Sequence, residues 1–149
     1  MFPPAEILEA AFDSASRYGL DAALVCAVVE QESAWDAAAI RYEPGFRVRY
    51  VVPLNLSPTE EVARSISWGL MQVMGQVARE HGFNDKFLSR LCIPTVGLEM
   101  GCCVLAAKIS AAAGDKVRGL ALWNGGANLS YPQEVLAKLG RYGSMRVPA

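Results

Sequence analysis

The chain has 149 residues, of which 52% are hydrophobic and 19% charged, a composition typical of a globular domain rather than a disordered segment. Its formal net charge of −1 provides no strongly basic field to recruit nucleic acid. We therefore expect no nucleic-acid binding. No apolar run is long enough to span a bilayer, so we also expect no membrane insertion.

The apolar residues predict a mainly α-helical chain. In the first helix they recur at helical spacing from Ile7 to Ala15, and Gly19 ends the helix. Asp21 is placed to cap a second helix, whose apolar run over 24–29 is that of a buried core element. The β-branched residues in this run would also allow a strand, but its length and the capping aspartate favour a helix.

The helical period fails after the second helix. Pro44, Gly45 and Pro53 interrupt it, and residues 47–52 alternate as a short extended segment would. We therefore expect an irregular or β-like insertion near residues 40–56.

Helices are expected again after the insertion. Ser57 to Glu60 has the pattern of a capping box with proline at the first helical position, which predicts a short helix to about Ser65. Further helices are predicted over 69–80, 94–113, 116–123 and 132–139, with a short helical piece within 83–91. No repeat or linker is visible, which predicts a single domain over residues 1–149.

The four cysteines do not have zinc-ligand spacing, and the one histidine, His81, is far from them in sequence. We expect no metal and no organic cofactor. We interpret the cysteines as free thiols that act as small buried hydrophobes. A disulfide from Cys92 to Cys102 or Cys103 is the alternative.

Three short motifs place polar residues beside apolar ones. They are Glu32-Ser33 at the end of the second helix, Gly69-Leu70-Met71-Gln72, and Trp123-Asn124-Gly125-Gly126. The neighbours of Glu32 are mainly apolar, and an apolar pocket raises a carboxyl pKa by disfavouring the charged form. The negative end of the helix dipole acts in the same direction. Glu32 is therefore a candidate acid for protonating a leaving oxygen.

In this order and at these intervals, the motifs resemble the active-site motifs of soluble lytic transglycosylases, within the goose-type lysozyme superfamily. The resemblance runs from about Leu20 to Tyr142. It implies a mainly α, lysozyme-like helical fold. It also implies an enzyme that cleaves the MurNAc–GlcNAc β-1,4 bond of peptidoglycan glycan strands and forms 1,6-anhydromuramoyl products. We expect the chain to act as a monomer.

The resemblance also assigns roles to single residues. Glu32 matches the catalytic general acid and base, and the matching substrate-binding residues are Ser33, Met71, Gln72, Trp123, Asn124 and Tyr131. One position departs from the family, because relatives usually carry Tyr-Asn-Ala-Gly where this chain has Trp123. Tryptophan keeps a ring for sugar stacking but offers only an N–H donor, which puts any role of a phenol at this position in doubt.

A second carboxylate would change the chemistry. Glu43 lies in the insertion and Asp36 just before it, and either could activate water, as a muramidase requires. Alternatively, Glu43 forms a surface salt bridge with Arg41 or Arg47. A muramidase and a non-catalytic wall-binding virion module therefore stay open beside the transglycosylase.

The first residues lack the basic and apolar regions of a signal peptide. A wall-cleaving enzyme without its own signal is typical of phages. We therefore expect a phage endolysin or a virion-associated enzyme that acts in the periplasm or cell wall. A clipped chain, or a module of a longer protein, is the alternative.

Overall fold

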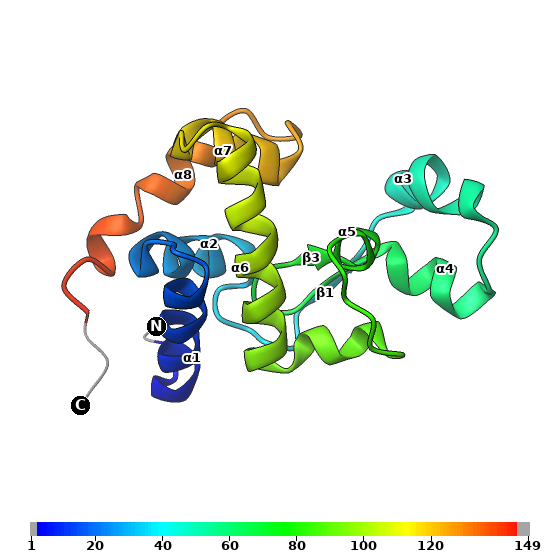
Figure 1. Cartoon of the computed structure of the whole chain (residues 1–149), viewed down its shortest axis with the longest axis horizontal. Helices are drawn as coiled ribbons and strands as arrows, with labels where there is room; N and C mark the ends of the chain where they lie inside the picture. The colour runs from blue at the N-terminus through cyan, green and yellow to red at the C-terminus, as the bar shows by residue number, and fades with distance from the viewer. Residues whose placement is uncertain (1–2, 146–149) are drawn as a thin grey trace.

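The computed structural model describes residues 3–145 and has the mainly α, lysozyme-like fold that the sequence predicts (Figure 1). Its helical body consists of α1 (Ala5–Arg17), α2 (Ala22–Ser33), α6 (Pro94–Ala111), α7 (Lys116–Asn124) and α8 (Tyr131–Leu136). The long helix α6 runs through the middle of the molecule, and α1 and α7 pack against it. None of the helices within residues 3–145 is long and apolar enough to cross a membrane.

The helix ends follow the local sequence. Asp21 caps α2 by accepting a hydrogen bond from the backbone N–H of Ala23 at 3.0 Å. Asp115 caps α7 in the same way through the N–H of Arg118. Pro94 occupies the first turn of α6, where its missing N–H costs no helical hydrogen bond.

The hydrophobic core lies between α1, α2, α6 and the sheet. Residues 24–29 of α2 are almost completely buried, as are Leu98 and Leu105 of α6. The core extends from Ala11 near one end of the chain to Tyr142 near the other. Because residues 24–29 of α2 are buried in the core, the final turn of this helix, which carries Glu32, is held in place by that packing.

The sheet has three short antiparallel strands in the order β1 (Ile40–Tyr42), β2 (Ile66–Trp68) and β3 (Val73–Met74). Residues 69–72 form the turn between β2 and β3, and α5 (Gly75–Glu80) begins only after β3. The prediction that Gly69 opens a helix is therefore wrong. Gly69 has φ +70°, and a Cβ there would lie 2.4 Å from the carbonyl oxygen of Leu91, so only glycine fits this turn.

The insertion between β1 and β2 is mostly helical. It contains α3 (Pro44–Phe46), the π-helical turn η1 (Arg47–Val51), the 3-10 turn η2 (Val52–Leu54) and α4 (Pro58–Arg64). The extended segment predicted over 47–52 is wrong, because side-chain contacts favour helical turns. The rings of Phe46 and Tyr50 meet at 5.0 Å between centroids, and Val51 is fully buried outside the main core.

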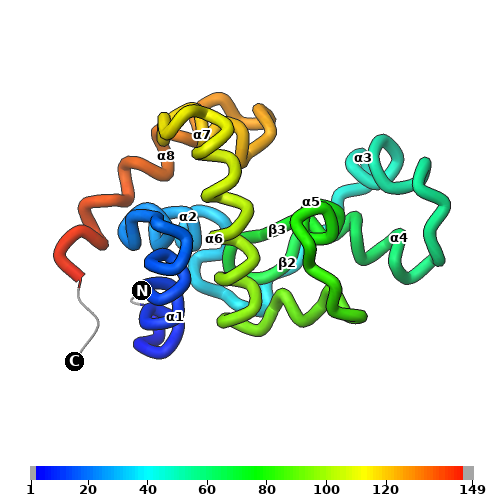
Figure 2. The backbone as a smooth tube through the Cα atoms, in the orientation of Figure 1, coloured from blue at the N-terminus to red at the C-terminus, as the bar shows by residue number. Residues whose placement is uncertain are grey.

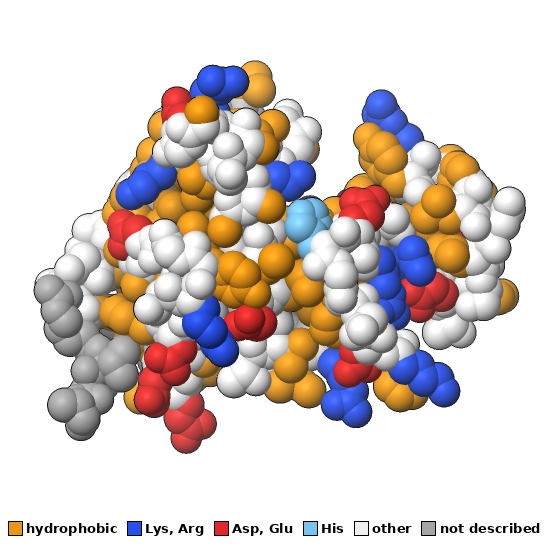
Figure 3. Space-filling view, in the orientation of Figure 1, with side chains coloured by type: hydrophobic (Ala, Val, Ile, Leu, Met, Phe, Trp, Pro, Cys, Tyr) orange, Lys and Arg blue, Asp and Glu red, His pale blue; other side chains and the backbone are white. Residues whose placement is uncertain are grey.

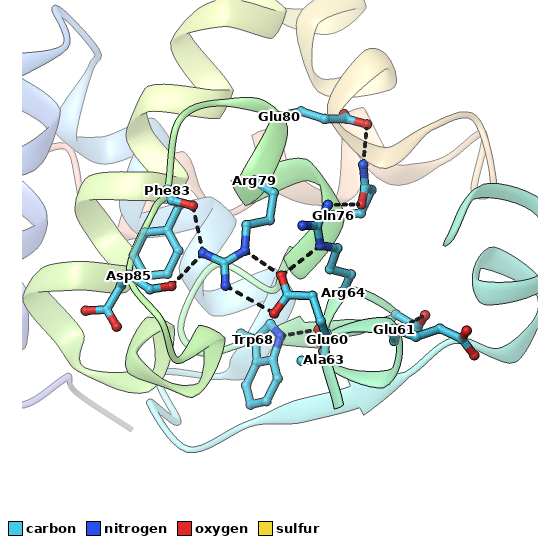
Figure 4. Close-up of polar contacts among 11 residues, drawn as sticks. Glu60, Glu61, Ala63, Arg64, Trp68, Gln76, Arg79, Glu80, Phe83 and Asp85 are labelled. Carbon is cyan, nitrogen blue, oxygen red and sulfur yellow. Dashed lines mark hydrogen bonds and ion pairs between the residues drawn. The ribbon is translucent and has the colours of Figure 1, made fainter. Parts of the chain in front are cut away.

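The insertion projects from the rest of the chain (Figure 2), and a polar network ties α4 to α5 (Figure 4). The Glu60 carboxylate accepts hydrogen bonds from Arg64 at 2.8 Å and from Arg79 at 2.7 Å. Arg79 also donates to the backbone carbonyls of Phe83 and Asp85. The predicted capping box is absent because Ser57 makes no side-chain capping bond, and Glu60 serves this network instead.

We expect Glu60→Gln to lower the free energy of unfolding by about 1–3 kcal/mol at neutral pH, since it removes charge-assisted hydrogen bonds. The hydrogen bond from Arg79, followed by that from Arg64, holds the pKa of Glu60 below its ordinary value. The stabilisation is therefore present above the carboxyl's unfolded-state pKa and is lost as the pH falls through the lower folded-state pKa. Denaturant titration at several pH values measures this difference.

The exposed glutamate Glu9 of α1 provides a control, since Glu9→Gln should leave stability within about 0.5 kcal/mol of the wild type. A Glu60→Gln deficit that is unchanged at acidic pH would contradict the assigned ionic role.

All four cysteines are free thiols, and the alternative disulfides are not formed. Cys26 and Cys102 are completely buried, which raises the pKa of each to about 12. These two side chains act as small core hydrophobes, as the sequence indicates.

Candidate active site

A cleft of about 510 Å³ lies between the helical body and the insertion, and the surface is deeply hollowed between these parts in Figure 3. The insertion side contributes Arg41, Glu43, Phe46 and Tyr50, and α6 and α7 contribute Val104, Lys108, Leu122, Trp123 and Asn124. The β2–β3 hairpin adds Ser67, Gln72, Val73 and Met74. Glu32 opens into this cleft. A second hollow of about 430 Å³ contains none of the motif residues.

Glu32 is bonded by two donors within the last turn of α2. Its Oε1 atom accepts a hydrogen bond from the Tyr131 hydroxyl at 2.5 Å and another from the Trp123 indole N–H at 3.0 Å. Burial raises the pKa of Glu32 above its ordinary value, although the two hydrogen bonds and the charge of Arg41 partly oppose this rise. The carboxyl group is therefore suited to carry a proton at a higher pH than an exposed glutamate.

The hydrogen bonds also determine which oxygen holds the proton. A carboxyl oxygen has two lone pairs, and Tyr131 and Trp123 occupy both of those on Oε1. Burial and the charge of Glu32 raise the pKa of Tyr131, so its hydroxyl stays a donor. No group within residues 3–145 bonds to Oε2 of Glu32, so the acid proton belongs on Oε2.

The end of α2 is fixed by a tight turn. Ala34 and Trp35 both have positive φ, at +50° and +67°, so the chain reverses immediately after Glu32-Ser33. The Trp35 indole N–H donates to the Tyr142 hydroxyl at 3.1 Å and anchors this turn in the core. Such strained backbone persists only where packing holds it.

The Ser33 hydroxyl bonds to backbone groups of the protein and does not face the cleft. Its hydroxyl donates to the backbone carbonyl of Leu70 at 2.8 Å, with the Val29 carbonyl as a second acceptor at 3.1 Å. Ser33 is not among the residues that line the cleft. The predicted substrate contact is corrected: Ser33 joins the end of α2 to the β2–β3 turn.

Gln72 lines the cleft, but its polar atoms also hold the β2–β3 turn. Its amide nitrogen donates to the carbonyls of Ala39 and Gly69, both at 2.9 Å, and its oxygen accepts from the Ser67 hydroxyl at 2.9 Å. Both amide hydrogens are therefore used within the protein. One lone pair of the amide oxygen is left for a ligand.

The expectation that Met71 offers apolar surface to a sugar is wrong. Its side chain is completely buried and packs against Gly101 of α6, where an added Cβ would lie 2.3 Å from the Met71 sulfur. The side chains of successive residues in this turn point in different directions, so Gln72 reaches the cleft while Met71 faces the core.

Trp123 and Asn124 both line the cleft at the end of α7. Trp123 has the role of a donor to Glu32 in addition to the ring surface that the sequence predicts. The Asn124 side-chain oxygen accepts from the N–H of Asn128 at 2.8 Å, which leaves its amide hydrogens for a ligand. Tyr131 is buried, does not line the cleft and donates to Glu32, so it is a partner of the acid rather than a sugar ligand.

The two further carboxylates lie in different places. Glu43 lines the cleft and also forms the predicted ion pair with Arg41, whose Nε donates to Glu43 at 2.6 Å. Asp36 is exposed outside the cleft, and its carboxylate accepts from the N–H of Ala38 in a local turn. Asp36 is therefore wrong as the residue that activates water.

Several cleft residues were not selected from the sequence, among them Arg41, Phe46, Tyr50 and Lys108. Phe46 and Tyr50 are four residues apart, a spacing that indicates contact on one face of a helix. The prediction of an extended segment did not take this spacing into account. Lys108 follows Val104 by one helical turn, and nothing in the sequence separates it from a solvated lysine.

A helical lysozyme-like fold with a partly buried carboxyl group in a cleft is typical of glycan-cleaving enzymes. Residues 9–133 match the family model of the transglycosylase SLT domain, and the chain belongs to this family. The family identity supports peptidoglycan as substrate, with transglycosylase or lysozyme-like activity in general. No curated protein and no solved structure matches the chain.

Proposed function

We propose that residues 1–149 form one catalytic domain that cleaves the MurNAc–GlcNAc β-1,4 bond without consuming water. Glu32 acts first as general acid and then as general base. The observation that carries this proposal is the arrangement at Glu32 in the cleft, where two donors occupy Oε1 and leave Oε2 free to carry a proton. One carboxyl group is sufficient because the nucleophile belongs to the substrate.

In the first step, the Oε2 proton passes to the glycosidic oxygen as the bond from that oxygen to muramoyl C1 breaks. The electron pair stays on the oxygen, and GlcNAc leaves with a free 4-hydroxyl group. The negative charge that develops on Glu32 is stabilised by the hydrogen bonds from Tyr131 and Trp123. These donors are already in place, so no reorganisation is needed at that moment.

In the second step, the 6-hydroxyl of the same muramoyl residue attacks C1 and gives its proton to Oε2 of Glu32. The product is a 1,6-anhydromuramoyl end, and the enzyme returns to its acid form. Atoms balance without water. The ring of Trp123, in the cleft beside Glu32, supports sugar stacking close to the reacting bond.

A muramidase is the second candidate because Glu43 lines the same cleft as Glu32. In that mechanism, Glu43 would assist an attacking water. The Arg41 partner argues against it, since a carboxylate oxygen of Glu43 already accepts a hydrogen bond from the Arg41 Nε.

We expect Glu43→Gln to retain the cleavage rate to within about threefold and to change stability by less than about 1 kcal/mol, as for an exposed ion pair. The Arg41 side chain is 77% exposed, so its pairing with Glu43 is weakened by solvent. Rates of wall clearing and thermal melting measure both effects. A loss of about a hundredfold or more on this change, with Glu43→Asp recovering part of the rate, would instead favour the muramidase.

Clearing of a purified wall suspension tests catalysis itself. The purified chain should clear the suspension, whereas a non-catalytic wall-binding module would bind it without clearing. We place the protein among phage endolysins or virion-associated enzymes as part of the same proposal, with the glycan strand as its partner and the monomer as its active form.

A further inference from the structure

Lys108 of α6 is an unpaired cation inside the cleft. It is half-buried and lies one helical turn beyond Val104, which lines the same cleft. Within the described residues 3–145, its ammonium group has no hydrogen bond, ion pair or ring contact. The other lysines are engaged: Lys86 lies over the Phe87 ring, Lys116 pairs with Asp21, and Lys138 bonds Gln31 and Glu134.

Among the charged residues that line the cleft within residues 3–145, Lys108 alone has no bonding partner. Arg41 and Glu43 pair with each other, and Glu32 accepts hydrogen bonds from Tyr131 and Trp123. On the insertion side, the guanidinium of Arg49 lies 5.2 Å from the centre of the Tyr50 ring, which itself lines the cleft. Basic side chains lie on both sides of the hollow in Figure 3. This contrasts with the net charge of −1 of the whole chain.

Lys108 is partly buried in the wall of the cleft, and its ammonium group lacks a protein partner for a charge-assisted bond within residues 3–145. A bound anion would supply that bond, and a carboxylate is the anion that peptidoglycan offers. Free carboxylates occur on its peptide stems, and on the lactyl group of muramoyl residues whose stem has been removed.

We propose that Lys108 binds a carboxylate of the substrate, so that the cleft selects glycan strands bearing free carboxylates over uncharged strands. This inference rests on the proposed function, since it places the strand in the same cleft as Glu32. Lys108 sets which strands bind, whereas Glu32 carries out the chemistry.

Binding of soluble strands to the full chain carrying Glu32→Gln tests the inference without turnover. Three strands are compared: stem-bearing strands, strands whose stems an amidase has removed, and stem-bearing strands whose carboxylates have been converted to amides. Lys108→Met should weaken binding of a carboxylate-bearing strand by about tenfold, the scale of one charge-assisted bond. It should leave the affinity for amidated strands unchanged.

Two further variants make the test specific. Lys108→Arg keeps the positive charge and should retain most of the affinity. Lys86→Met removes an exposed lysine that does not line the cleft and should have no effect on any strand. Added salt should lower the affinity of the Glu32→Gln chain for carboxylate-bearing strands towards the affinity measured when Lys108→Met is also present.

The strand on which Lys108→Met loses affinity identifies the carboxylate. A loss on stem-bearing strands alone assigns the stem, and a loss on amidase-treated strands alone assigns the lactyl group. A loss on both shows that either carboxylate is accepted. An equal loss on amidated strands, or no loss on any strand, overturns the inference.

Wall clearing by the wild-type chain separates this inference from the proposed function. If the chain fails to clear walls but binds strands through Lys108 and their carboxylates, the proposed function fails and the inference stands. If it clears walls and Lys108→Met binds all strands as tightly as its parent, the function stands and the inference fails.

Discussion

Glu32→Gln is expected to reduce wall clearing by at least about a hundredfold, the scale of lost general acid catalysis. Glutamine preserves the shape of the side chain but cannot donate an acid proton from the position of Oε2. Its amide oxygen can still accept the hydrogen bonds from Tyr131 and Trp123, so the fold should be intact. Initial clearing rates at equal protein concentration measure the loss.

The pH dependence of stability provides a second readout for the same variant. Burial raises the folded-state pKa of Glu32 above the unfolded value, so its stabilising contribution is fully present below the unfolded pKa. That contribution is lost as the pH rises through the folded pKa. Glu32→Gln should therefore match the wild type in acid and become the more stable protein as the pH rises.

Glu30→Gln is the matched control on the same helix. Glu30 lies outside the cleft and pairs with Arg141 at 2.6 Å. Removing the charge of Glu30 should therefore leave the clearing rate unchanged. A folded Glu32→Gln protein that clears walls at a near wild-type rate would contradict the assignment of Glu32.

Tyr131→Phe is expected to produce the second largest effect, a loss in rate of about tenfold to a hundredfold. The change removes the 2.5 Å hydrogen bond that stabilises the Glu32 carboxylate once its proton has left. The same bond lowers the pKa of Glu32, so its removal should raise that pKa further. The high-pH limit of the rate profile should then move to higher pH, since the acid form persists longer.

Rate profiles against pH separate this effect from a structural one. Tyr142→Phe is the control, because Tyr142 is also a buried tyrosine but its hydroxyl bonds Trp35 rather than Glu32. It should alter stability without moving the profile. A Tyr131→Phe profile with an unshifted high-pH limit would show that the hydroxyl does not act on Glu32.

The helical body could be predicted from the sequence because its signals are local and long. The apolar run of α2, its cap at Asp21 and the proline that begins α6 each specify an element without knowledge of its neighbours. The mainly apolar surroundings of Glu32 could be predicted for the same reason, since they come from the same helix and turn.

Short segments were less predictable, because periodicity over a few residues does not separate a helix from a strand or turn. Gly69 to Gln72 form a turn because Leu91 approaches Gly69 closely and Ala39 binds Gln72, and both partners are distant in sequence. Residues 47–51 are helical because Arg47 bonds Glu61 of α4 and Val51 finds a buried site. Tertiary contacts of this kind outweigh local alternation.

The geometry of the site could be predicted only in part. The motifs and Tyr131 predict that Glu32, Gln72, Asn124 and Tyr131 share one groove, and the first three line the cleft whereas Tyr131 does not. The sequence does not indicate that Trp123 and Tyr131 donate to the same oxygen of Glu32. Substituting tryptophan for the usual tyrosine seemed to remove a polar contact. The indole N–H provides such a contact from a different atom, and its position depends on how α7 and α2 both pack against α8.

Mass spectrometry of the fragments released from purified peptidoglycan in isotopically labelled water tests the central claim most directly. If Glu32 is the single acid and base, the muramoyl ends are 1,6-anhydro forms, lighter than reducing ends by one water and free of the label. Reducing muramoyl ends that carry the label would show that water is the nucleophile and would contradict the transglycosylase mechanism.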